Sequence, residues 1–142
     1  MADLDPRAWH RMTVKVTTRD LDELGHVNNR VYLGYVELLA RAHSDRLGMT
    51  IPVLRNMGVL PVVRRHEIDY RRPALDGDEL ELTTVITYAL GVRATRDNFV
   101  RRLRDGADLV FCRTDWVWVD PLTGRPRPLP AEAMTAYGGE RG

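Results

Sequence analysis

The sequence is poor in cysteine, because Cys112 is the only one among 142 residues. A single thiol excludes an intrachain disulfide and argues against a cysteine-based metal site. No two of the four histidines have the spacing of metal ligands, so we expect no metal ion and no other cofactor. Cys112 itself lies in an apolar stretch and is interpreted as a core residue.

The sequence also lacks long hydrophobic runs and an excess of either charge. No apolar run approaches the ~20 residues of a membrane span, and the opening MADLDPRAWHR does not resemble a secretion signal. We therefore expect a cytoplasmic protein without a membrane partner. The net charge of +1 gives no broad basic field, so no nucleic-acid partner is expected.

What remains is the composition of an ordinary globular protein, with 44% hydrophobic and 29% charged residues. The length predicts a single domain over residues 1–142. Residues 1–10 are interpreted as a loose N-terminal tail. Residues 121–142 are interpreted as a proline-rich C-terminal extension made of turns and a short last helix.

A long helix is predicted over residues 29–47. Apolar side chains recur there at spacings of three and four, which places them on one wide face. Gly48 follows where a left-handed C-terminal cap is expected. Such a face requires a large apolar partner. It consists of two rows, one with Val31, Tyr35, Leu38 and Ala42 and the other with Tyr32, Val36, Leu39 and Leu47.

Alternating apolar residues and turn pairs predict β-strands on both sides of this helix. The turn pairs are Asp76-Gly77 and Asp105-Gly106, and residues 50–58 are expected to be a connector. Long antiparallel strands twist and curl, so the fold class is α+β, with one central helix wrapped by a curved sheet of about five strands. The predicted strands are residues 12–18, 59–72, 79–88, 92–104 and 109–119.

The last predicted strand is apolar on both faces. One face carries Trp116 and Trp118, and the other carries Val117 and Val119. One set can face the helix, and a second subunit could cover the other. This pattern predicts a homo-oligomer. The alternative is that the Trp rings lie half-exposed beneath the chain's own C-terminal segment.

The loop before the helix holds the residues that could perform chemistry. Asp22 is the natural base or nucleophile, and His26 could orient water or substrate. Asn28 and Asn29 lie at the first helical turn, whose free amides and positive dipole end could hold an oxyanion. This set suits attack on an acyl carbonyl with a good leaving group such as a thiolate.

A structural interpretation competes for every one of these residues. Asp and Asn before a helix are most often caps, and His26 beside Gly25 is typical of a turn. His43 and His66 are interpreted as structural residues. The arginine pairs are usually solvated, although one pair could contact a phosphorylated carrier. These pairs are Arg64/Arg65, Arg71/Arg72 and Arg101/Arg102.

The run D-x-D-E-L-G-H-V-N-N-x-x-Y from Asp20 to Tyr32 resembles the signature loop of the hotdog-fold thioesterases. It is similar to the 4-hydroxybenzoyl-CoA type and to plant acyl-ACP thioesterases. The resemblance implies a hotdog fold and dimers, often paired into tetramers, with the active site at the subunit interface. Asp22 takes the place of the catalytic Asp, the Asn29 backbone amide polarises the thioester carbonyl, and His26 matches a His of the plant enzymes. Leu24 departs from the plant pattern, which has Asn there, and this favours an arrangement centred on Asp22.

The predicted function is therefore hydrolysis of an acyl-CoA, or of an acyl group on a carrier protein, to a carboxylic acid and a thiol. The catalytic candidates are Asp22, His26, Asn28 and Asn29. Two alternatives stay open at this point. One is a dehydratase or hydratase of the same fold, and the other is a module that binds an acyl thioester without cleaving it.

Overall fold

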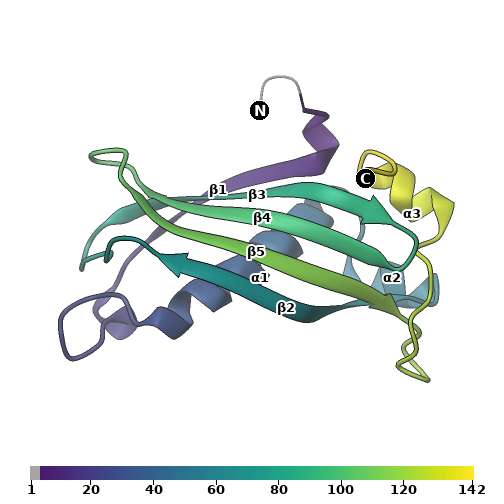
Figure 1. Cartoon of the computed structure of the whole chain (residues 1–142), viewed down its shortest axis with the longest axis horizontal. Coiled ribbons are helices and arrows are strands. Elements are labelled where there is room, and N and C mark those ends of the chain that lie inside the picture. The colour runs from purple at the N-terminus through teal and green to yellow at the C-terminus, as the bar shows by residue number, and fades with distance from the viewer. Residues whose placement is uncertain (1–3) are drawn as a thin grey trace.

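The computed structural model describes residues 4–142. In this part of the chain, five strands form one antiparallel sheet in the order β1-β3-β4-β5-β2. The sheet curves across one long helix, α1 (Asn29–Arg46), as Figure 1 shows. This arrangement confirms the predicted α+β architecture. The strands are β1 (Trp9–Lys15), β2 (Leu60–Tyr70), β3 (Glu79–Leu90), β4 (Arg93–Arg102) and β5 (Asp108–Val119).

Helix α1 begins and ends where the sequence predicts. The Asn28 side chain accepts a hydrogen bond from the Arg30 amide and caps the first turn. At the other end Gly48 has φ +78°, and the amides of Gly48 and Met49 donate to the carbonyls of Asp45 and Ser44. This is a Schellman cap, which requires a left-handed residue at the glycine position.

The two predicted apolar rows of α1 are buried to different extents in this chain. Tyr32, Val36 and Leu39 are at most 2% exposed and face the sheet. In the other row Leu38 is 42% exposed, and its neighbour Tyr35 is half-buried. The second row is only partly buried, because Val31 and Tyr35 pack against the edge of the core while Leu38 faces solvent.

Two short helices lie together at one end of the molecule, one in the expected connector and one in the C-terminal extension. The expected connector contains α2 (Ile51–Asn56), so that prediction is wrong there. Thr50 caps α2 through its hydroxyl, and Pro52 in the first turn suits a helix start. The predicted last helix is present as α3 (Ala131–Ala136), and α2 and α3 lie together at one end in Figure 1. None of the described helices combines the length and apolar character that crossing a bilayer requires.

The prediction of a loose tail over residues 1–10 does not hold for its second half. Residues 6–8 form a 3-10 turn, η1 (Pro6–Ala8), and β1 starts at Trp9. Ala8 is fully buried, and the carbonyl of Arg7 accepts a hydrogen bond from His43 on α1. These tertiary contacts order the segment, and residues 1–3 of the predicted tail lie outside the described residues.

The C-terminal extension covers part of the core. Trp118 is 6% exposed and packs against Tyr137, with ring centroids 6.1 Å apart. Val117 on the opposite face of β5 is 8% exposed, while Trp116 is half-buried. Much of the apolar surface of β5 is thus covered within one chain, so this strand alone no longer requires a second subunit. Oligomerisation stays a prediction.

We expect Leu39→Ala to lower the free energy of unfolding by about 2–5 kcal/mol, because it leaves a cavity between α1 and the sheet. Leu38→Ala is the matched control one position earlier, where the 42% exposed side chain predicts a change within about 0.5 kcal/mol. Urea denaturation followed by circular dichroism measures both. Equal losses in the two variants would show that the buried row has been wrongly identified.

Candidate active site

The loop before α1 folds back on the backbone of Asp22. The Asp22 amide donates to the carbonyl of His26 at 2.7 Å, and the Gly25 amide donates to the carbonyl of Asp22 at 3.1 Å. Gly25 takes φ +75°, which allows the reversal. The Asp22 carboxylate closes the loop, because its Oδ1 accepts from the amides of Leu24 at 2.9 Å and His26 at 3.1 Å. The carboxylate is therefore held in one orientation.

Further hydrogen bonds fix this loop to the helix and to the body of the domain. The Asn28 amide donates to the carbonyl of Asp20, and the Val27 amide donates to the carbonyl of Ala74. Val27 is 2% exposed, so it anchors the loop in the core. The Asn28 side chain is occupied as the cap of α1. The structural interpretation thus accounts for Asn28.

Three of the four predicted residues line one cleft, which we call the Asp22 cleft and which has a volume of about 320 Å³. Asn28 does not line it. The Asp22 and His26 side chains are half-buried, while Asn29 is exposed at the first turn of α1. The lining residues are Asp22, Leu24, His26, Val27, Asn29, Tyr32, Tyr70, Arg71, Arg72 and Pro73.

The cleft combines an available carboxylate oxygen with the positive end of a helix. Within residues 4–142, no donor contacts Asp22 Oδ2, and no acceptor contacts the N–H of Asn29. The Asn29 amide belongs to the first turn of α1, where unpaired N–H groups and the helix dipole favour negative charge. The arrangement can therefore present a base or nucleophile and an oxyanion donor to one carbonyl group.

The end of β2 and the residues after it form one wall of the cleft, where the sequence pointed only to the pair Arg71/Arg72 and gave Tyr70 no role. The Tyr70 hydroxyl donates to the carbonyl of Asn29 at 3.3 Å, across 41 positions of sequence. Tyr32 accepts a hydrogen bond from the Ala74 amide through its hydroxyl. No local spacing indicates these contacts, because they depend on how β2 crosses the start of α1.

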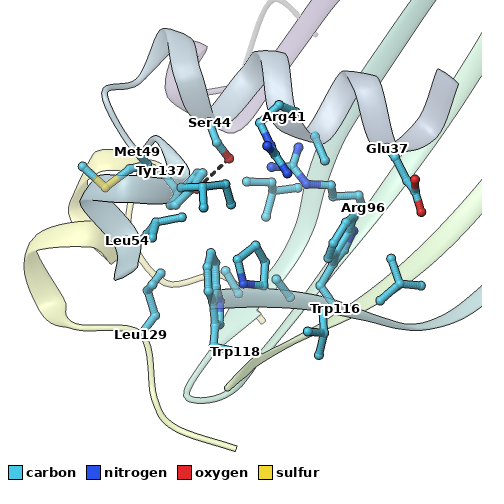
Figure 2. A pocket seen from close by; sticks show the side chains of 18 of the residues that line it. Glu37, Arg41, Ser44, Met49, Leu54, Arg96, Trp116, Trp118, Leu129 and Tyr137 are labelled. Carbon is cyan, nitrogen blue, oxygen red and sulfur yellow. Dashed lines mark hydrogen bonds between the residues drawn. The ribbon is translucent and has the colours of Figure 1, made fainter. Parts of the chain in front are cut away.

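A second cavity, of about 390 Å³, lies toward the opposite end of α1, and we call it the apolar cavity (Figure 2). It lies between α1, α2, the strands β2 to β5 and the C-terminal segment. Apolar side chains predominate, among them Trp116 and Trp118 on β5. The exceptions include Arg96 of β4, together with Glu37 and Arg41 of α1.

Arg96 is buried beside His43, and the two side chains share a short hydrogen bond. Arg96 Nη1 donates to His43 Nδ1 at 2.8 Å, and His43 Nε2 lies 2.8 Å from the carbonyl of Arg7. A neutral His43 with its proton on Nε2 satisfies both contacts. Burial, and then the nearby Arg96 cation, lower the pKa of His43 to about 3. The predicted structural role of His43 agrees with this geometry.

Comparison with known proteins now identifies the family. Residues 16–137, which are most of the chain, match the family described as the thioesterase-like superfamily. The chain belongs to this thioesterase-like superfamily. The match begins at the end of β1 and continues into the C-terminal segment, so it includes both the Asp22 cleft and the apolar cavity.

Individual relatives of this thioesterase-like chain are named as thioesterases or thioester hydrolases. The acyl-CoA thioester hydrolase YbgC of Escherichia coli is 30% identical over 132 residues, which cover 89% of this chain and 94% of the relative. A chloroplastic acyl-acyl carrier protein thioesterase of Arabidopsis thaliana is 24% identical over 92% of this chain and 69% of the relative. The predicted activity class, thioester hydrolysis, is thereby supported over hydration and over binding without cleavage.

Solved structures show the same fold. A 1,4-dihydroxy-2-naphthoyl-CoA thioesterase from Synechocystis superposes with a TM-score of 0.82 at 21% identity, covering 91% of this chain and 95% of that one. A probable thioesterase from Bartonella henselae gives 0.77 at 26% identity, covering 87% and 100%. The hotdog fold predicted for this thioesterase-like chain is confirmed.

The lowered pKa of His43 predicts how the stability of this thioesterase-like fold depends on pH. The unfolded chain binds the His43 proton near pH 6.5 and the folded chain only near pH 3. The free energy of unfolding should therefore fall as the pH drops below about 6.5, by up to about 1.4 kcal/mol per pH unit. Urea denaturation at pH 7, 6 and 5 measures the slope. His43→Gln should flatten it, and an unchanged slope in that variant would contradict the assignment.

Proposed function

We propose that this chain hydrolyses the thioester of an acyl-CoA, or of an acyl carrier protein, in the Asp22 cleft. The products are a carboxylic acid and a free thiol. The observation that carries the proposal is the orientation of Asp22, whose Oδ1 is held by two backbone amides while Oδ2 has no donor within residues 4–142. A carboxylate fixed in this way can serve as base or nucleophile without losing freedom during the reaction.

The Asn29 amide is proposed to bind the carbonyl oxygen of the thioester. Negative charge develops on that oxygen when the carbonyl carbon is attacked, and the positive end of α1 stabilises it. Asp22 Oδ2 acts in one of two ways. It removes a proton from a water molecule that attacks the carbon, or it attacks the carbon itself and forms an anhydride that water then cleaves. In both routes the C–S bond breaks and the thiolate leaves.

The arginines beside the cleft are proposed to receive the phosphate groups of the carrier. Arg71 and Arg72 line the Asp22 cleft, unlike the other two arginine pairs in the sequence. Guanidinium groups pair with phosphate through two hydrogen bonds. Because CoA and phosphopantetheine carriers both contain phosphate, this contact suits either substrate. The expected cytoplasmic location is part of the same proposal.

A homodimer through strand β2 is also proposed. β2 forms one edge of the sheet, and its exposed residues Val62 and Tyr70 are each 44% accessible. Antiparallel pairing of two β2 strands about His66 brings the Tyr70 end of one copy beside the Val62 end of the other, across the bulge between Val63 and Arg65. It also sets Arg65 opposite Glu67 of the second copy, which is a favourable charge pair. Since Tyr70 lines the Asp22 cleft and Val62 lines the apolar cavity, this pairing brings the two hollows together.

Asp22→Asn should lower kcat for acyl-CoA hydrolysis by at least about 100-fold, because the amide cannot act as base or nucleophile. The Asn side-chain oxygen can still accept from the Leu24 and His26 amides, so the loop and the melting temperature should be retained. Glu23→Gln is the matched control, since Glu23 is an exposed neighbouring carboxylate. Thiol release detected with a disulfide reagent measures both. Near-normal turnover in Asp22→Asn would remove Asp22 from the mechanism.

Arg65→Glu should weaken the dimer by placing like charges opposite one another, and the double variant Arg65→Glu/Glu67→Arg should restore it. Arg64→Glu changes the charge equally but lies in the bulge of β2, outside the Arg65–Glu67 pairing, so it should leave the dimer intact. Size-exclusion chromatography with light scattering at low salt gives the mass of each variant. A monomeric wild type, or a double variant no more dimeric than the single one, would overturn this pairing.

A further inference from the structure

The apolar cavity contains a buried positive charge that the chain itself does not balance. Arg96 is 6% exposed, and within residues 4–142 no carboxylate forms an ion pair with it. Its contacts are His43, which is neutral, and the Thr84 hydroxyl at 3.3 Å. Burial lowers the pKa of Arg96 to about 10, so the side chain is still charged at neutral pH. A buried charge without a counter-ion is costly, and proteins usually pair such groups.

The hydrogen-bonding capacity of Arg96 is mostly unused. Only Nη1 has acceptors in the described residues, which leaves the donors of Nε and Nη2. These two nitrogens form one edge of the guanidinium, the edge that binds a carboxylate through two parallel hydrogen bonds. Since Arg96 lines the apolar cavity, a ligand within it can reach the side chain.

The surrounding polar groups favour an anion over a cation. Arg41 adds a second guanidinium to the lining, and it has no ion pair within residues 4–142. The Nε1–H of Trp116, another lining residue, is buried without an acceptor. The lining carboxylate is Glu37, which is exposed and forms no ion pair with Arg96 within residues 4–142. Ser44 and Tyr137 hydrogen-bond each other at 2.7 Å.

We propose that the apolar cavity binds the far end of the acyl group, and that Arg96 selects chains ending in a carboxylate. The apolar walls would contact the methylene chain, and the free edge of Arg96 would pair with the terminal carboxylate. The substrate class is then the thioester of a dicarboxylic acid. This inference rests on the proposed hydrolysis and on the β2 dimer, which brings the cavity of one copy beside the Asp22 cleft of the other.

Binding of simple amphiphiles tests the cavity without relying on catalysis. Octanoate, octanol and octylammonium share a chain length and differ in charge. We expect octanoate to bind at least tenfold more tightly than octanol, and octylammonium to bind most weakly. Trp116 and Trp118 line the cavity, so quenching of tryptophan fluorescence and titration calorimetry both report binding. Equal affinities for octanoate and octanol would overturn the proposal.

Variants of Arg96 connect this preference to its charge. Arg96→Met should abolish the advantage of octanoate, whereas Arg96→Lys should retain part of it. Arg93→Met is the matched control, because Arg93 is an exposed arginine on the same strand. Circular dichroism and the melting temperature establish that each variant is folded. If Arg96→Met does not fold, Arg96→Gln replaces it in the same measurement. Loss of the preference for octanoate over octanol in folded Arg96→Gln would support the proposal. An unchanged preference would overturn it.

Hydrolysis separates this inference from the proposed function. We expect kcat/KM for 7-carboxyheptanoyl-CoA to exceed that for octanoyl-CoA at least tenfold, and the ratio to fall to about one or below in Arg96→Met. Hydrolysis of both thioesters at equal rates would overturn the inference while leaving the proposed function intact. Selective octanoate binding through Arg96 with no hydrolysis of either thioester would instead overturn the proposed function and retain an anion-binding cavity.

Discussion

The packing of one face of α1 into the concave side of the sheet is the contact on which the rest of the structure depends. Tyr32, Val36 and Leu39 are almost completely buried in this contact. It fixes the direction of the helix axis relative to the strands. The position of the Asp22 loop at one end and of α2 and α3 at the other then follows (Figure 1). The helix is therefore both the core of the domain and the element that orients its functional groups.

The two ends of α1 provide two chemically different environments. At the N-terminus, backbone amides and a fixed carboxylate meet in a cleft partly open to solvent. Such a place suits a reaction in which charge develops and a water molecule takes part. Toward the C-terminus, tryptophans and aliphatic side chains enclose a cavity suited to a chain of methylene groups. The cavity lining on α1 begins at Glu37, so a rise of roughly 12 Å along the helix separates it from Asn29.

The buried pair of Arg96 and His43 shows how the fold holds a charge inside its core. His43 is neutral because burial and the adjacent cation both oppose its protonation. Its Nδ1 can then accept a hydrogen bond from Arg96, while Nε2 donates to the carbonyl of Arg7. The Arg7 carbonyl, which precedes β1, thus helps to position Arg96 on β4 through His43. Arg96 is held through Nη1, and its other donors have no acceptor within residues 4–142.

The sequence by itself determined the elements whose signals are local. The period of α1, its cap at Asn28, the turn at Gly77 and the loop around Asp22 all follow from residues within a few positions of one another. The family resemblance of that loop supplied the activity class. Only the tertiary structure decided which apolar row of α1 is buried, since two adjacent rows carry the same period. Only it brought Tyr70 to Asn29 and Arg96 to His43, because those contacts join residues 41 and 53 positions apart. Such pairs depend on strand register and sheet curvature, which a local pattern does not contain.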